Sequence, residues 1–265
     1  GLAMVVPYKG RRIRPLEALN AVISAGGAVV DIIAITAVSG ILIGAMNITG
    51  VAFSLTQQII SLSGGSLAML LLITAFASLI LGLPLPTLGV YVILATLAAP
   101  ALTQAGISAI QAHMFVLFSG ILGMVTPPVA LAAFAGATIA QSDQWKTGWV
   151  ATRLSWCAYL IPFMFAYSPE LVMNGALWDV LLRLAITLAG IFAGTVAVVG
   201  FLATRVAPAG RILFAAIALM LLAQPTMFDG AGWVNIAGAL AGAAAVGWEM
   251  TRARAARPAA PPQEL

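Results

Sequence analysis

Charged residues are scarce in this sequence, because Asp, Glu, Lys and Arg together make up only 8% of its 265 residues. A water-soluble domain normally carries about a quarter of charged residues, since its whole surface has to be solvated. The shortage comes with 62% hydrophobic residues and a mean hydropathy of +1.07. Composition therefore excludes an ordinary soluble enzyme and indicates an all-α protein that spans a membrane several times.

Cysteine and histidine are almost absent, with one of each, Cys157 and His113. One cysteine cannot form an internal disulfide and one histidine cannot build a metal cluster, so neither redox nor zinc chemistry is supported. A phosphate-binding loop of the Gly-x-x-x-x-Gly-Lys-Ser/Thr type is also missing, so energy from ATP would have to enter through another chain. We predict that the chain is not an enzyme and uses no cofactor.

The net charge is +4 and the isoelectric point is near 9.7, but the basic residues do not indicate a nucleic-acid binder. They stand in short clusters at the ends of apolar runs, which is how membrane proteins anchor their loops. With the cluster at 9–14 in the cytoplasm, the later clusters fall on the same side only if the segment 66–102 enters and leaves the membrane from one face. The positive-inside rule thus favours a re-entrant segment there.

The first apolar run, at 17–46, is too long for one straight span. As a helix it would measure about 45 Å, against about 30 Å for the hydrocarbon core of a bilayer. We expect a break at Gly26-Gly27, with an arm helix along the interface before it and a span after it. A shorter, partly polar helix is expected at 51–62.

Two interrupted elements follow. Apolar segments at 66–81 and 88–102 are joined by the tip Gly82-Leu83-Pro84-Leu85-Pro86-Thr87, a pattern that predicts a re-entrant helical hairpin. The run 108–140 is again too long for one span, and Gly123-Met124-Val125-Thr126-Pro127-Pro128 breaks it near its middle.

Four further apolar stretches, at 154–172, 178–203, 212–227 and 233–250, follow a polar loop that contains Lys146 and Arg153. Asp179 and Arg183 are four residues apart in the order that favours a local ion pair.

The expected divisions are a basic collar with an interfacial arm helix (1–27), a membrane span with a short helix (28–65), a transport core (66–140), four C-terminal transmembrane helices (141–250) and a disordered tail (251–265).

The hairpin tip at 82–87, followed by Thr126-Pro127-Pro128-Val129, resembles the C-terminal half of the large membrane subunit of tripartite ATP-independent periplasmic (TRAP) transporters, most closely the fused-permease type. The resemblance covers residues 16–170, approximately. The sequence departs from the usual family pattern at Ala130, where glycine is common, and at the hairpin tip. The resemblance implies one half of an inverted-repeat, elevator-type transporter in the bacterial inner membrane. It also implies a periplasmic solute-binding protein as partner and an N-terminal remainder of the same permease, so the chain is expected to be a fragment.

The two breaks, at 82–87 and 123–128, also predict an ion-binding site on physical grounds if they face each other. Each interrupted helix leaves backbone carbonyls unpaired, and the C-terminal end of a half-helix carries partial negative charge, so two such ends together form a cation site. Oxygen donors suit Na⁺, the expected coupling ion. The predicted metal ligands are Gly82, Thr87, Gly123, Thr126, Pro127 and Val129. The opposing half-helix N-termini favour a carboxylate. The predicted substrate-binding residues are Asn47, Pro84, Pro86 and Pro128.

Other interpretations stay open at this point. The prolines can also act as plain kinks repaired by neighbouring helices, although paired breaks in successive segments favour an ion site. For His113, a structural hydrogen bond is favoured over proton coupling. A membrane-embedded enzyme would need His113, Cys157 and Asp31 together, but the expected topology separates them. An elevator-type transporter without a binding protein and a purely structural subunit remain alternatives. The favoured prediction is a permease for Na⁺-coupled uptake of a small organic anion, whose identity the sequence does not define.

Overall fold

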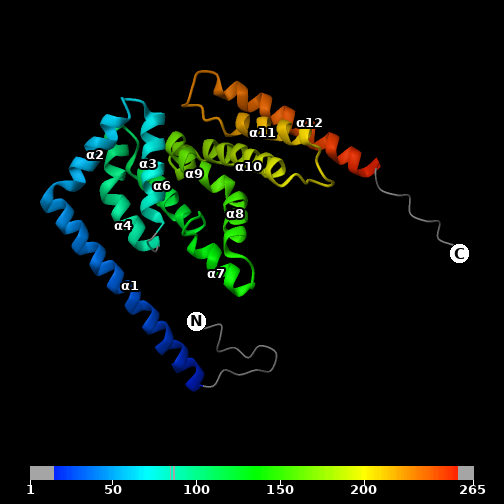
Figure 1. Cartoon of the computed structure of the whole chain (residues 1–265). Helices are drawn as coiled ribbons and strands as arrows, with labels where there is room; N and C mark the ends of the chain where they lie inside the picture. Colours follow the sequence, from blue (N-terminus) through cyan, green and yellow to red (C-terminus); the bar gives the residue numbers. More distant parts are fainter. Residues whose placement is uncertain (1–14, 84, 86, 256–265) are drawn as a thin grey trace.

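The computed structural model describes residues 15–83, 85 and 87–255, and within this part of the chain the regular elements are helices (Figure 1). Among the described residues, the single pairing of extended backbone is an isolated bridge between Phe201 and Arg205. Three stretches are long and apolar enough to cross a membrane, namely Thr87–Gln104, Leu177–Val199 and Ala231–Arg252. The chain is an all-α, polytopic membrane protein, as its composition predicts.

The first helix, α1 (Pro15–Thr49), is a single helix of 35 residues, so the expected break at Gly26-Gly27 is wrong. Glycine lowers helix propensity by about 1 kcal/mol, but unlike proline it keeps its N–H group, and the backbone ladder therefore continues. The helix projects from the rest of the molecule like an arm (Figure 1). Its end is anchored where Met46 packs against Ile93 and Leu97.

After α2 (Val51–Leu62), the predicted hairpin is present as α3 (Leu67–Gly82) and α4 (Thr87–Leu97). Ser66 caps the first arm by accepting from the Met69 amide. The second arm, expected as one helix at 88–102, is divided at Ala98 and continues as α5 (Ala99–Gln104), which has Pro100 in its first turn. Proline has no N–H to continue the ladder. The Ala101 amide donates to the Ala98 carbonyl at 3.2 Å, and the hydroxyl of Thr56 on α2 donates to the Leu97 carbonyl, 3.1 Å away.

The second interrupted element is also confirmed. Helix α6 (Ala109–Ile121) begins with a capping box formed by Ser108 and Gln111 and passes into a short 3-10 turn, η2 (Leu122–Met124). An irregular segment follows before α7 (Leu131–Ile139) resumes the element. Helix α6 is the centre of the first core, where Phe115 and Val116 are fully buried between the hairpin and α9.

The remainder of the chain adds further helical elements. These are α8 (Gln144–Leu154), α9 (Trp156–Tyr167), the 3-10 turn η3 (Pro169–Val172), α10 (Leu177–Val199), α11 (Pro208–Leu222) and α12 (Ala231–Ala255). The segment of α8 was expected to be a polar loop, but Asp143 caps it by accepting from the Lys146 amide at 2.7 Å. Helix α12 ends at Ala255, five residues into the expected tail, and the rest of the tail and the basic collar lie outside the described residues.

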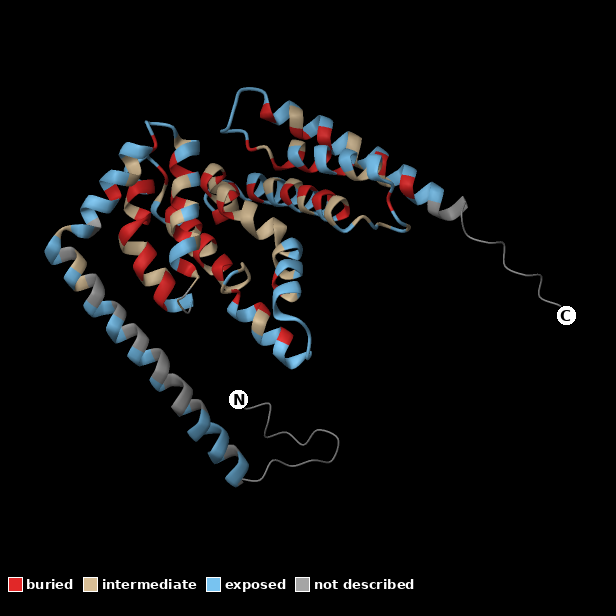
Figure 2. Ribbon diagram, viewed as in Figure 1, coloured by how far each residue is buried: buried red, intermediate tan, exposed pale blue. Residues whose placement is uncertain are grey.

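Buried residues gather where the hairpin meets α6 and where α10 to α12 pack together, while outward faces are exposed (Figure 2). Many exposed side chains are large and apolar, such as Phe76, Ile139 and Leu219. In a membrane protein these faces contact lipid rather than water.

The expected Asp179–Arg183 ion pair is not formed within the described part of the chain, which is a correction to the sequence-based interpretation. Arg183 donates instead to the side-chain oxygen of Asn235 on α12, 3.1 Å away. Asn235 in turn donates to the carbonyls of Met220 and Ala223 near the end of α11. A neutral acceptor on a packed neighbouring helix thus replaces the local carboxylate.

Candidate functional site

The tip of the hairpin lies directly against the break in the second element. A Cβ atom built on Gly82 would stand 2.0 Å from the Gly120 carbonyl oxygen, and one on Gly123 would stand 2.5 Å from the Gly82 carbonyl carbon. Distances this short leave room only for hydrogen atoms, so backbone touches backbone here. Gly82 and Gly123, two of the predicted ligands, are therefore brought together.

The second arm of the hairpin also reaches the break. Thr87, the first residue of α4, has its hydroxyl oxygen 3.2 Å from the sulfur of Met124 in η2. Thr87 is exposed, so its hydroxyl keeps acceptor capacity beyond this weak bond. A third predicted ligand thus lies beside the break.

Thr126 is held from two sides within the break. Its hydroxyl donates to the Leu122 carbonyl at 2.5 Å and lies 2.6 Å from the hydroxyl of Tyr159 on α9. A hydroxyl has one hydrogen and two lone pairs, so one lone pair on Thr126 remains available after these bonds. The hydroxyl of Thr152 on α8 donates to the Val125 carbonyl, 3.1 Å away, and fixes the neighbouring peptide.

Several carbonyls at the break lack a hydrogen-bond donor. Within the described residues, no donor reaches the carbonyl oxygens of Gly82, Pro127, Pro128 and Val129. The Gly123 carbonyl, by contrast, accepts from the Thr126 amide at 3.4 Å, and the Thr126 carbonyl accepts from the Ala130 amide at 3.1 Å. The peptide between Pro127 and Pro128 is cis. The break therefore presents neutral oxygen atoms, the kind of ligand that a hard cation prefers.

Ala130 has a left-handed backbone, with φ of 39° and ψ of 45°, and is fully buried just before α7. This conformation brings Cβ close to the following carbonyl and costs a non-glycine residue about 1–2 kcal/mol. The place where the sequence departs from the usual glycine is thus the place where glycine fits the backbone best.

Replacing Ala130 by glycine is expected to change stability by less than about 1 kcal/mol, because the backbone strain removed offsets the loss of a buried methyl group and the added freedom of the unfolded chain. Thermal unfolding of the detergent-solubilised permease measures this change. Ala135→Gly, at an exposed position in the middle of α7, is the matched control and should lower stability by about 1 kcal/mol. A larger loss of stability in Ala130→Gly than in Ala135→Gly would show that Ala130 is not strained.

Of the four predicted substrate-binding residues, the structure places one at the break. Pro128 is exposed at the break. Pro84 and Pro86 lie outside the described residues. Asn47 belongs to the last turn of α1, but its side chain also lies outside the described part. Those three assignments remain predictions.

Three buried hydroxyls near the tip were not foreseen from the sequence. Thr74 and Ser78 on α3 and Ser119 on α6 are almost completely buried, and their hydroxyl oxygens have no hydrogen-bond partner within the described residues. The two helices pack against each other along this seam. The spacing of four between Thr74 and Ser78 in an apolar run was the available signal, since it places both on one helix face.

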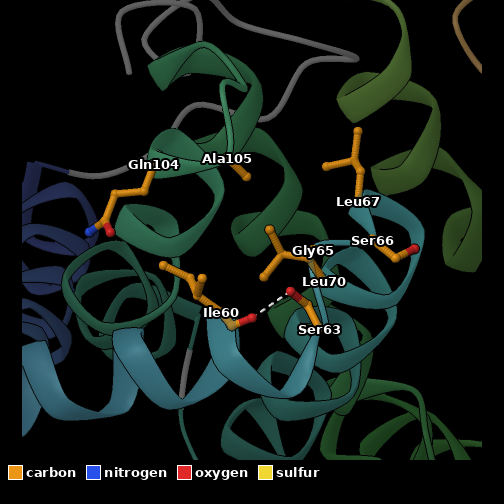
Figure 3. Close-up of a pocket in the computed structure, with 8 residues that line it drawn as sticks. All are labelled: Ile60, Ser63, Gly65, Ser66, Leu67, Leu70, Gln104 and Ala105. Carbon is orange, nitrogen blue, oxygen red and sulfur yellow. Dashed lines mark hydrogen bonds between the residues drawn. The ribbon is translucent and has the colours of Figure 1, made fainter.

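Other features lie away from the break. His113 is half-buried, with its Nδ1 atom 3.2 Å from the Tyr91 hydroxyl on α4, the hydrogen-bonded arrangement of a structural histidine. A hollow of about 300 Å³ lies at the opposite end of the hairpin, where Ser66, Leu70 and Gln104 are among its lining residues (Figure 3). The length of α3, about 24 Å, separates this hollow from the tip.

Among the described residues there is no group of three or more His, Cys, Asp or Glu side chains that could hold a metal ion. The oxygen atoms that the described residues present at the break are those of carbonyls and hydroxyls. This arrangement suits a monovalent ion better than a divalent one, because a divalent ion normally needs carboxylates to balance its charge.

The chain matches the family described as "Tripartite ATP-independent periplasmic transporter, DctM component" over residues 1–180. This range contains the hairpin, the interrupted helix, α8 and α9. No curated protein and no solved structure matches the chain.

Proposed function

Because the chain belongs to the DctM family of TRAP transporter membrane components, we propose that it takes up a small organic anion together with Na⁺ across the bacterial inner membrane. The family makes it a transporter component. The coupling ion, the carboxylate substrate and the periplasmic binding protein that delivers it are our proposals.

The observation that carries the Na⁺ proposal is the contact between the hairpin tip and the broken helix. Gly82 touches Gly120 and Gly123 there, and unpaired carbonyls of Gly82, Pro127 and Val129 belong to the same two breaks. Thr87 and Thr126 supply hydroxyl oxygens at the same place. Irregular backbone at membrane depth is tolerated only inside protein or beside a water-filled cavity, and broken helices with carbonyl ligands are how transporters bind Na⁺.

The substrate would approach the positive end of a half-helix. Helix α7 begins at Leu131, immediately after the break, and the first amides of a helix favour an anionic group such as a carboxylate. Pro128 lies exposed beside this end. We propose that Asn47, Pro84 and Pro86 complete the path of the substrate.

The experiment is uptake into proteoliposomes that contain the full permease, with its binding protein outside and a panel of radiolabelled mono- and dicarboxylates as probes. An inward Na⁺ gradient should drive uptake, whereas a choline gradient should not. Thr87→Ala should reduce Na⁺-driven uptake several-fold. A contact between a hydroxyl and a charged group is worth about 1.5–3 kcal/mol, and a water molecule in place of the hydroxyl would recover part of this energy. Thr138→Ala is the matched control, since that exposed hydroxyl makes its hydrogen bonds away from the break, to the Phe134 carbonyl and with the Gln144 amide group.

Uptake that a proton gradient drives without Na⁺ would contradict the proposal and would direct attention to His113. Uptake that is equal in the Thr87→Ala and Thr138→Ala variants would remove Thr87 from the site.

A further inference from the structure

A second hollow, of about 630 Å³, opens between α8, α10 and α11, far along the chain from the hairpin. Its polar end is formed by Arg153 and Arg211, and its walls include Ala197, Pro208 and Ile212. Ile212 is 72% exposed and Leu213 is 50% exposed, so the wall continues into a lipid-facing surface. The hollow thus combines a cationic end with an apolar side, as an amphiphile requires.

Both guanidinium groups are fixed on the last carbonyls of α10. Arg153 donates to the Val198 carbonyl at 2.6 Å, and Arg211 donates to the same oxygen at 3.1 Å and to the Ala197 carbonyl at 2.8 Å. The negative end of a helix dipole favours cations at this position. Because each guanidinium has five N–H donors in a planar fork, most donors on both remain free after these bonds.

No carboxylate balances this pair of charges in the part of the chain that the structure describes. The ion pair found there joins Arg252 to Glu249, at 3.3 Å. Glu249 approaches the first turn of α11, 3.7 Å from a Cβ built on Gly210, but it is paired with Arg252. Two arginines that share one acceptor repel each other, and an anion between them would relieve this repulsion.

We propose that this hollow binds the phosphate headgroup of an anionic phospholipid, with an acyl chain along the wall formed by Pro208 and Ile212. Arginine forks bind phosphate oxygens bidentately, and basic pockets between membrane helices are the usual sites of anionic headgroups. Arg153 belongs to the part that matches the family, whereas Arg211 lies beyond residue 180. The lipid would therefore join the C-terminal helices to the transporter part.

The test uses the full permease in nanodiscs of phosphatidylcholine with or without phosphatidylglycerol, with bound lipid counted by native mass spectrometry and stability followed by thermal unfolding. Phosphatidylglycerol should be retained and should raise the melting temperature of the unmodified protein. Arg153→Gln and Arg211→Gln should each weaken retention roughly tenfold, the loss of one charged hydrogen-bonding partner. Arg205→Gln is the control, because Arg205 is exposed in the loop after α10 but does not line the hollow.

Equal retention of phosphatidylglycerol in all three variants would overturn the proposal. So would a loss in Arg205→Gln as large as in the other two, because it would show that the lipid is attracted by the overall positive charge and not by this hollow. Inorganic phosphate is added to the detergent-solubilised protein in a separate arm, and stabilisation by phosphate equal to that by lipid would replace the lipid with a soluble anion. If Arg211→Gln does not fold, Arg153→Gln keeps the test decisive, because Arg153 is exposed and makes one helix-end contact.

Discussion

Replacing Gly82 by alanine is expected to abolish uptake and to lower the stability of the permease by about 3 kcal/mol, the upper range for overpacking. The added methyl group would stand 2.0 Å from the Gly120 carbonyl oxygen, and backbone on both sides prevents a local adjustment. The hairpin tip would have to move away from the broken helix. Gly123→Ala, whose methyl group would meet Gly82 at 2.5 Å, should have the same effect.

Radiolabelled uptake and thermal unfolding measure the two consequences separately. Gly136→Ala is the matched control, because this glycine lies in α7 with no atom within 4 Å of its built Cβ. Alanine there should leave uptake unchanged and raise stability by up to about 1 kcal/mol through helix propensity. Normal uptake by Gly82→Ala would mean that the tip and the break do not act as one unit.

Replacing Thr126 by valine is expected to raise the half-saturating Na⁺ concentration at least roughly tenfold, since it removes a proposed ligand and the two bonds that orient it. The Tyr159 hydroxyl would lose its hydrogen bond to Thr126, and the Leu122 carbonyl would keep only the Val125 amide as donor. Valine has nearly the same volume as threonine, so the change is chemical rather than steric. The dependence of uptake on Na⁺ concentration, at fixed ionic strength, measures the effect.

Tyr159→Phe separates the two contributions. It removes one bond to Thr126 and leaves the threonine hydroxyl in place, so the half-saturating Na⁺ concentration should rise only about fivefold, as expected for about 1 kcal/mol. An unchanged Na⁺ dependence in Thr126→Val would eliminate this hydroxyl as a ligand. Equal effects of the two variants would assign the whole contribution to orientation.

The interrupted elements could be predicted from the sequence because proline removes a donor wherever it stands. The breaks at 82–87 and 123–128 follow from this local rule, and the structure has both. Segment length supplied the second clue, since 108–140 is too long for a single span. What the local rule cannot provide is the contact between the two breaks, which depends on how α3 packs against α6.

The errors occurred where the competing energies were small. The glycine pair at 26–27 lowers helix propensity without removing a hydrogen bond, so α1 continues through it. The polar segment that became α8 was expected to be a loop because of its charges, although Asp143 before it is a good helix cap. Arg183 was assigned to Asp179 by spacing, while tertiary packing offered Asn235.

The residues at the break also differ in whether the local sequence could reveal them. Gly82, Thr87, Gly123 and Thr126 were predicted from residue types close to prolines, and the structure places them at the tip and the break. Tyr159 and Thr152 were missed because they lie on other helices, and a single tyrosine or threonine in an apolar run has no distinguishing pattern. Only the folded arrangement of α8 and α9 beside the break reveals their role in holding it.

If the hairpin tip and the broken helix form one Na⁺ site, Na⁺ should bind to the purified full permease and stabilise it. Thermal unfolding is recorded in increasing NaCl, with choline chloride and KCl at equal ionic strength as references. The stabilisation should be saturable and specific to Na⁺, and Gly123→Ala should abolish it whereas Gly136→Ala should preserve it. Equal stabilisation by the three salts, or a Na⁺ effect that survives in Gly123→Ala, would contradict the proposal of one Na⁺ site.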